Sequence, residues 1–229
     1  MNDTIYQAAA LIVPLVIAIV FHEVAHGWTA RALGDPTAAE LGRLSLNPIR
    51  HVDPFGTVIL PGMLMLAGWP VFGWAKPVPV VKARLRNPRR DMMIVAAAGP
   101  GSNLVMAAIA AVALGLLLPG QGEGQGGPLQ TFLFANLLMF ISINVFLALF
   151  NLLPIPPFDG GHIVEGLLPP AVARRYAGLH SKALLIMILL LVVVPLAFPS
   201  LNVVRWLVGP LVEWLTGRYM ELAAAIAGA

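Results

Sequence analysis

The stretch LIVPLVIAIVFHEVAHGWTA, residues 11–30, is an almost unbroken apolar run that carries His22, Glu23 and His26 in its second half. A run of about 20 apolar residues is long enough to cross the hydrocarbon core of a membrane as a helix. Ionisable side chains are costly at that depth unless they work together. The stretch therefore predicts a membrane-spanning helix that contains a functional polar cluster.

The composition of the whole chain is that of a membrane protein. Of 229 residues, 59% are hydrophobic and 11% are charged, and the mean hydropathy is +0.84, unlike soluble domains. The net charge of +3 comes from short basic clusters between apolar runs, so we expect the lipid bilayer as a partner and no nucleic acid. Because the chain has no cysteine, a metal must be held by histidine and carboxylate groups.

Four apolar stretches predict an all-α polytopic membrane protein with about four to six transmembrane helices. These stretches are 5–33, 91–118, 131–153 and 183–199. Residues 201–217 contain Trp206 and Trp214 and predict an interfacial amphipathic helix or one half of a terminal hairpin. We expect residues 1–229 to form one intramembrane domain, with 183–217 as its C-terminal part.

Basic residues predict the orientation of the chain. The linker 76–90 is rich in Lys and Arg and has no acidic residue, which is typical of the cytoplasmic side, and 169–182 follows the same rule. The linker 119–130 has neither Lys nor Arg. We therefore expect a multi-pass protein of the cell membrane with its N-terminus outside, and a metal at middle depth toward the cytoplasm.

Residues 55–75 are apolar but are interrupted by proline and glycine, and both flanks are basic. This pattern predicts a re-entrant hairpin, with a fifth span as the alternative. Polar and apolar residues alternate over 42–46, and 78–81 is rich in valine, which predicts two short strands near the hairpin. We therefore expect a small β or re-entrant element over 41–82, although 41–50 could also be a plain cytoplasmic loop.

The pattern His22-Glu23-x-x-His26 has the spacing of a zinc site on a helix. Residues four apart lie on one helical face, so one zinc ion can contact both imidazoles. Glu23 projects from the same turn, where it can take a proton from the attacking water. The alternative is a structural network of polar side chains that joins helices.

A catalytic zinc site needs a third protein ligand, and Asp159 is the best candidate. It follows the predicted span in the stretch NLLPIPPFDGGH, residues 151–162, where prolines stop the helix and two glycines allow close backbone approach. An ordinary N-cap of the short helix 160–168 is the alternative role of Asp159. His162 and Glu40 are weaker candidates for the third ligand.

Three motifs together resemble the site-2 protease family of intramembrane metalloproteases: HEVAH, NLLPIPPFDGGH and the stretch AGPGSN at residues 98–103. The stretch 42–56 is similar to the compact bacterial branch without PDZ or CBS domains. The resemblance implies one zinc ion held by His22, His26 and Asp159. It also implies Glu23 as general base and Asn151 beside the scissile peptide. Residues 154–168 are expected to form the Asp-Gly-Gly loop and a short helix.

The expected function is therefore zinc-dependent hydrolysis of peptide bonds within or next to transmembrane segments of membrane proteins. Regulated proteolysis or clearance of membrane remnants is the expected role. A membrane metal-binding or transport protein, or a non-catalytic homologue, is the alternative. Asn103 and Asn144 lie inside predicted spans, where an amide can join helices as readily as it can serve catalysis.

Overall fold

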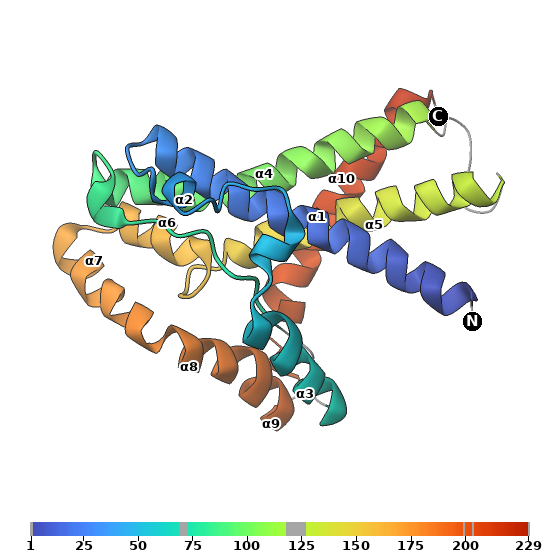
Figure 1. The fold of residues 1–229 in the computed structure, drawn as a ribbon. Helices are drawn as coiled ribbons and strands as arrows, with labels where there is room; N and C mark the ends of the chain where they lie inside the picture. Colours follow the sequence, from blue (N-terminus) through green and yellow to red (C-terminus); the bar gives the residue numbers. More distant parts are fainter. Residues whose placement is uncertain (1, 69–72, 118–126, 199, 203, 229) are drawn as a thin grey trace.

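The computed structural model describes the chain except residues 1, 69–72, 118–126, 199, 203 and 229. Most of the predicted linker 119–130 therefore lies outside the described residues. The described part is all helical, and none of it forms a β-strand. The all-α prediction is confirmed in that part (Figure 1).

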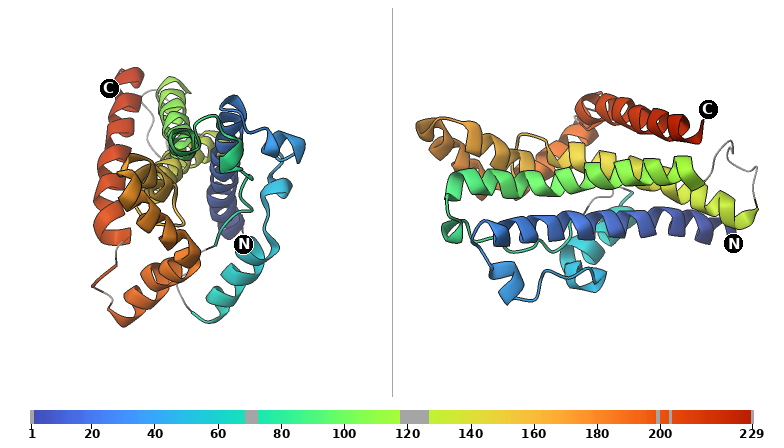
Figure 2. Two further views of the ribbon diagram at one scale, coloured as in Figure 1. Left: turned by 90° about the vertical axis from the view of Figure 1, so that its left-hand side faces the viewer. Right: turned by 90° about the horizontal axis from the view of Figure 1, so that it is seen from above.

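Three long helices lie side by side and form the body of the molecule (Figure 2). They are α1 (Asn2–Ala32), α4 (Pro88–Leu117) and α5 (Pro128–Asn151). Each contains an apolar stretch long enough to cross a membrane, and a fourth such stretch is Pro170–Ala197. The prediction of four spans is confirmed by length and composition.

The fourth stretch is a chain of short helical pieces rather than one regular helix. These pieces are α7 (Pro170–Ala177), η4 (Gly178–Lys182), α8 (Ala183–Ile188), η5 (Leu189–Val193) and α9 (Val194–Ala197). Figure 1 shows them running along one side of the molecule, away from α10. This stretch forms one wall of the site described below.

The C-terminal helix differs from the prediction for 201–217. After η6 (Val204–Val208), helix α10 extends over Gly209–Ala227 and packs along α4 and α5. The Tyr219 hydroxyl donates to the Leu104 carbonyl at 2.9 Å. A Cβ on Gly115 of α4 would lie 2.5 Å from the Ala223 carbonyl oxygen, so the two backbones nearly touch. Helix α10 is therefore packed against the bundle.

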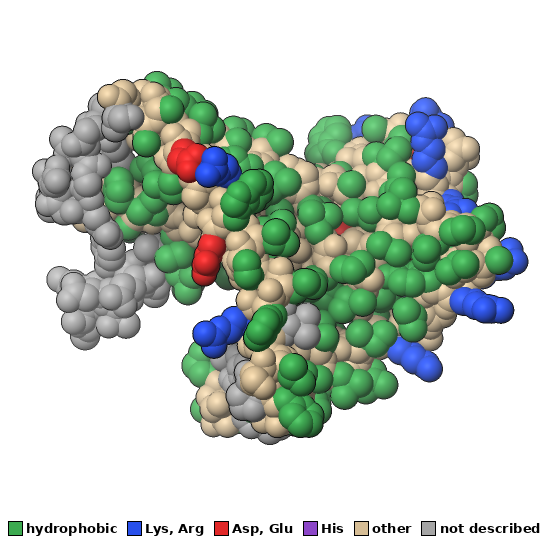
Figure 3. All heavy atoms as spheres, turned by 180° about the vertical axis from the view of Figure 1, so that it is seen from behind, with side chains coloured by type: hydrophobic (Ala, Val, Ile, Leu, Met, Phe, Trp, Pro, Cys, Tyr) green, Lys and Arg blue, Asp and Glu red, His purple; other side chains and the backbone are tan. Residues whose placement is uncertain are grey.

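Small side chains allow this close packing. The main core cluster consists of Ala107, Ala110, Ala111, Leu114, Ile141, Val145 and Ala223. Many large apolar side chains remain on the outside instead, and Figure 3 shows them covering the rear face. A surface of this kind suits lipid rather than water.

The segment after η1 (Pro48–His51) forms a hairpin-like excursion. Helices η2 (Pro54–Ile59) and α3 (Leu60–Leu66) carry the chain away from the body, as Figure 1 shows. Together they rise about 20 Å at 1.5 Å per residue, which is short of the roughly 30 Å of a hydrocarbon core.

The chain then returns to the place where the excursion began. The backbone N–H of Trp74 donates to the Gly56 carbonyl at 3.1 Å, and that of Lys76 donates to the His51 carbonyl at 2.8 Å. Both ends of the excursion thus lie together, which is what a re-entrant hairpin requires. These contacts favour the hairpin over the alternative of a fifth span.

The predicted strands at 42–46 and 78–81 do not form. Their polar groups bind side chains instead of each other. The Gly42 carbonyl accepts from the Arg50 guanidinium at 2.6 Å, and the Val78 N–H donates to the Glu23 carboxylate at 2.8 Å. Pro77 and Pro79 have no N–H to donate, so a regular ladder cannot continue here.

Candidate metal centre

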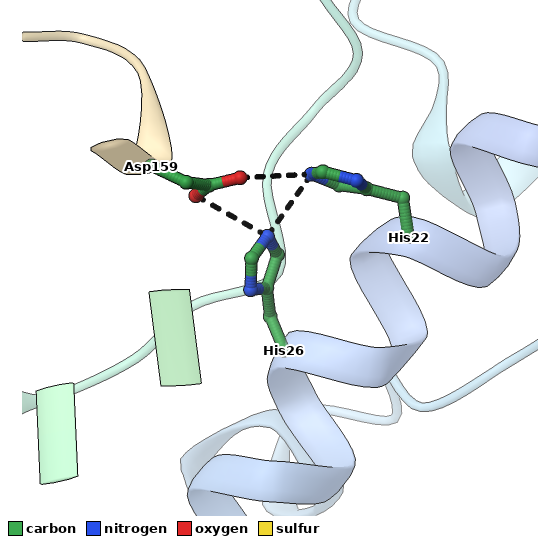
Figure 4. Close-up of side chains that lie close together, drawn as sticks. All are labelled: His22, His26 and Asp159. Carbon is green, nitrogen blue, oxygen red and sulfur yellow. Dashed lines mark hydrogen bonds and ion pairs between the residues drawn. The ribbon is translucent and has the colours of Figure 1, made fainter. Parts of the chain in front are cut away.

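Three side chains from opposite parts of the chain meet in the interior (Figure 4). His22 and His26 of α1 are 7% and 9% exposed, and their Nε2 atoms are 3.1 Å apart. The Asp159 carboxylate places Oδ2 3.1 Å from His22 Nε2 and Oδ1 3.4 Å from His26 Nε2. The structure thus brings together the three predicted metal ligands.

A sharp turn after α5 brings Asp159 to the histidines. Asp159 is the first residue of α6 (Asp159–Leu167), which begins just below the end of α5. A Cβ on Gly160 would lie 2.2 Å from the Leu152 carbonyl oxygen and 2.3 Å from that of Leu153. Only glycine permits this approach. The N-cap is Phe158, and no side chain caps the helix, so the N-cap role considered for Asp159 is wrong.

Hydrogen bonds determine which histidine nitrogens face the centre. His26 Nδ1 lies 2.7 Å from the Val95 carbonyl oxygen. A carbonyl only accepts, so the neutral imidazole carries its proton on Nδ1 and has its lone pair on Nε2. Nε2 is the atom that points toward Asp159.

A relay of two buried amides determines the tautomer of His22 in the same way. Asn144 Nδ2 donates to the Phe140 carbonyl at 2.8 Å, so Asn144 Oδ1 accepts from Asn103 Nδ2 at 2.8 Å. Asn103 Oδ1 is then left to accept from His22 Nδ1 at 2.6 Å. The two asparagines thus both join helices and orient a candidate ligand.

The resulting donor set fits a cation. In the neutral imidazoles, two Nε2 lone pairs face each other beside a carboxylate, and nothing between them supplies a proton. Asp159 Oδ2 is buried and has no hydrogen-bond partner among the described residues. The separations of 3.1–3.4 Å match the edges of about 3.3 Å of a tetrahedron with Zn–N bonds of about 2.0 Å.

Asp159 supplies the carboxyl group of the centre, with Oδ2 turned toward His22 and Oδ1 toward His26. A carboxylate is the form that binds a metal. Three ligands leave one position of a tetrahedral zinc open, which is typical of catalytic sites.

Glu23 and Asn151 line the same cavity as the three candidate ligands. The cavity has a volume of about 690 Å³, and its other walls are largely apolar. Glu23 Oε2 accepts the Val78 N–H, which holds the carboxylate against the returning segment. The Asn151 amide nitrogen donates to the Leu147 carbonyl of its own helix at 2.9 Å.

The weaker candidates for the third ligand lie elsewhere. Glu40 is on the surface, where it pairs with Arg84 at 2.6 Å. His162 lines the cavity, but its ring belongs to a different group of side chains, with Glu165 and His180. Neither residue joins His22 and His26.

Gly99 is a site residue that motif spacing does not identify. Helix α4 passes so close to the histidines that a Cβ on Gly99 would lie 2.4 Å from His26 Nε2 and 2.7 Å from His22 Cε1. The AGPGSN stretch carries this glycine, but nothing local in it indicates two imidazoles as neighbours. The absence of a side chain at this position makes room for the centre.

Asp35 is a second residue near the site that the sequence motifs do not identify. It is fully buried and accepts the backbone N–H of Val81 at 2.6 Å, as well as the N–H and hydroxyl of Thr37. Burial raises the pKa of this carboxyl, but the Thr37 and Val81 hydrogen bonds outweigh burial and lower it. Asp35 and Glu23 together fasten the segment that passes over the site.

Removal of the amide relay should weaken zinc binding. Asn103→Leu leaves His22 Nδ1 without an acceptor, so the ring loses its preferred tautomer and orientation. We expect zinc affinity to fall by roughly 10–100-fold. Competition with a zinc chelator measures this loss. Ser102→Ala is the control, since the Ser102 hydroxyl donates to the Gly99 carbonyl of its own helix. Equal zinc affinity in the Asn103→Leu and wild-type proteins would contradict the assignment.

Several known proteins have similar sequences. The model of Peptidase family M50 matches residues 10–136 and 125–196. YwhC of Bacillus subtilis, named as a candidate zinc metalloprotease, is 39% identical over 199 residues, which cover 85% of this chain and 87% of YwhC. Rip2 of Mycobacterium tuberculosis strain H37Rv, named in the same way, is 30% identical over 215 residues, or 91% of this chain and 74% of Rip2.

No solved structure matches the chain. The family model nevertheless covers most of it, and the His22, His26 and Asp159 group has the composition of an HExxH zinc site with a distant aspartate. The chain therefore belongs to peptidase family M50, the site-2 protease family of zinc metalloproteases.

Proposed function

We propose that this M50 peptidase hydrolyses peptide bonds within or next to the transmembrane segments of other membrane proteins. One observation carries the proposal: the candidate centre lies part-way along α1, inside the apolar stretch Leu11–Ala32 that is able to cross a membrane. A centre at that depth meets substrate chains that are themselves in the bilayer. Regulated proteolysis and removal of membrane remnants are the roles that such chemistry suits.

We assign one zinc ion per chain to His22, His26 and Asp159. When bound, zinc polarises the substrate carbonyl and makes water acidic enough to ionise near neutral pH. Glu23 takes the proton of the attacking water and later gives it to the leaving amine. The Val78 N–H holds one Glu23 oxygen at 2.8 Å, which leaves the other oxygen for proton transfer. Asn151 lines the cavity and is assigned to substrate orientation.

The walls of the cavity support a membrane substrate. One wall consists of apolar side chains of α8 and η5: Ala183, Leu184, Met187 and Leu191. The returning segment, with Trp74, Pro77 and Val78, forms another. Apolar walls around a few polar groups suit a hydrophobic peptide whose cleavage site is the only polar part that must be recognised.

Cleavage-site mapping tests the proposal. Purified protein is reconstituted in liposomes with a single-span substrate, and the products are identified by mass spectrometry. We expect cuts inside the span or within a few residues of its ends. Cleavage confined to water-soluble peptides, with the span left intact, would contradict the proposed substrate class.

We further propose that the N-terminus faces outside and that 76–90 faces the cytoplasm. Figure 2 supports this orientation, because the C-terminus of α1, the N-terminus of α4 and α7 lie at one end of the bundle. Basic residues at that end include Arg31, Arg89, Arg90, Arg174 and Arg175. They are the cytoplasmic signal of the positive-inside rule.

Single cysteines test the orientation cleanly, since the chain has none of its own. In intact cells, a cysteine at Arg84 should resist an impermeant thiol reagent and should react once the cells are opened. A cysteine at Gly127 should react in both conditions. Reaction at position 84 in intact cells would reverse the orientation.

A further inference from the structure

A second group of side chains that could hold a metal ion lies beside the first one, one helical turn further along α6. It consists of His162 and Glu165 of α6 and His180 of η4, and one potential ligand atom of each lies within 4.8 Å of the others. His180 Nε2 is 3.3 Å from Glu165 Oε2, and His162 Nδ1 is 3.7 Å from the same oxygen. These separations resemble the edges of about 3.3 Å in a tetrahedral zinc site and those of the first centre.

Two nitrogens of this group lack the hydrogen bonds that buried polar atoms need. His162 Nδ1 and His180 Nε2 are inaccessible to solvent and have no hydrogen-bond partner among the described residues. A buried nitrogen without a hydrogen-bond partner destabilises the folded state. The rings are stacked with centroids 4.5 Å apart, so they cannot turn freely toward other partners. One cation could satisfy both nitrogens and Glu165 Oε2 together.

We propose that His162, Glu165 and His180 bind a second divalent cation of the zinc class, separate from the catalytic ion. Two imidazoles and a carboxylate are ligands that zinc prefers. Burial and the neighbouring His180 lower the pKa of His162, which favours the neutral ring that a metal requires. The inference goes beyond the proposed function and does not depend on it.

Lys82 sets the strength of this second site. Its Nζ lies 2.6 Å from Glu165 Oε1, which leaves Oε2 free for the cation. The positive charge nevertheless repels a second cation close by. The second site is therefore weaker than the first, which has no Lys or Arg among its cavity-lining residues.

The cation would join two parts of the molecule that bound the active site. Helix α6 begins with Asp159, and η4 leads directly into α8, whose Ala183 and Leu184 line the cavity. In the absence of the cation, the described contacts between α6 and η4 in this group are the long histidine–carboxylate contact and the ring stack. Binding would fasten the cavity wall to the helix that carries the third catalytic ligand.

Zinc stoichiometry of the purified full chain tests the site. The protein in detergent is dialysed against zinc buffers of increasing free concentration, and bound zinc is measured by elemental analysis. We expect one zinc per chain at low free zinc and a second at higher free zinc. His180→Ala should keep the first and lose the second, whereas Ser181→Ala, the adjacent control, should bind both.

Lys82→Gln distinguishes a metal site from a plain network of ion pairs. It removes the competing charge, so the second zinc should bind more tightly, on the order of tenfold. Unchanged or weaker binding in Lys82→Gln would overturn the proposal, as would a second zinc retained by His180→Ala. Wild-type protein that takes only one zinc at every concentration would overturn it as well, while leaving the catalytic assignment intact.

Discussion

Glu23→Gln should abolish peptide hydrolysis and leave the zinc content unchanged. Glutamine has nearly the same shape and can still accept the Val78 N–H, so the returning segment keeps its contact. It cannot take a proton from water at neutral pH. General-base catalysis contributes roughly 10²–10⁴-fold, and we expect kcat to fall by at least that factor.

Asp159→Ala should give a different result, because it removes a candidate ligand rather than the base. Zinc and activity should be lost together, since two histidines alone hold zinc poorly. Elemental analysis and turnover of a reconstituted substrate, measured on the same preparations, separate the two outcomes. Full zinc in Asp159→Ala would refute the third ligand, and normal turnover in Glu23→Gln would refute the base.

Gly99→Ala should destroy the zinc site although it replaces none of the predicted ligands. The new methyl group would lie 2.4 Å from His26 Nε2 and 2.5 Å from His26 Cε1, far inside van der Waals contact. Either α4 moves outward or the imidazoles leave their positions, and both changes spread the ligands apart. We expect zinc affinity to fall on the order of a hundredfold or more, with activity falling in parallel.

Gly101→Ala is the matched control, two residues further along the same helix. A Cβ at Gly101 meets nothing within 4 Å. Alanine in a helix interior is roughly 0.5–1 kcal/mol more stable than glycine, so this variant should bind zinc normally and unfold at the same or a slightly higher temperature. Normal zinc in Gly99→Ala, or equal losses in both variants, would contradict the packing described here.

Local patterns were enough to predict the spans and the first two candidate ligands. The apolar runs correspond to α1, α4, α5 and the stretch 170–197, since run length alone sets whether a helix can cross a membrane. His22 and His26 share a helical face because four residues make about one turn. The sequence made Asp159 only a candidate for the third ligand. It is more than a hundred residues from His26, so no local spacing places it beside α1.

The structure differs from the sequence-based predictions where specific side chains bind the backbone of a segment or pack against it. Valines at 78–81 suited a strand, but Glu23 and Asp35 take the N–H groups of Val78 and Val81. Residues 201–217 predicted an interfacial amphipathic helix or one half of a terminal hairpin, and α10 packs its Ala223 backbone against Gly115. The β-propensity of a segment shows that it can form a strand, but its tertiary contacts determine whether the strand forms.

The membrane class and the HExxH helix could be predicted from the sequence by itself. Both depend on residues close together in the chain, through the helical period, the length of an apolar run and the cost of charge in lipid. The close approach of Gly99 to the two histidines, the amide relay behind His22 and the Glu165 group depend on contacts between distant segments. The position of a residue in the sequence does not determine which distant side chain it will contact. Only packing of α1, α4, α5 and α6 into one body decides that, because each contact requires the others to be in place.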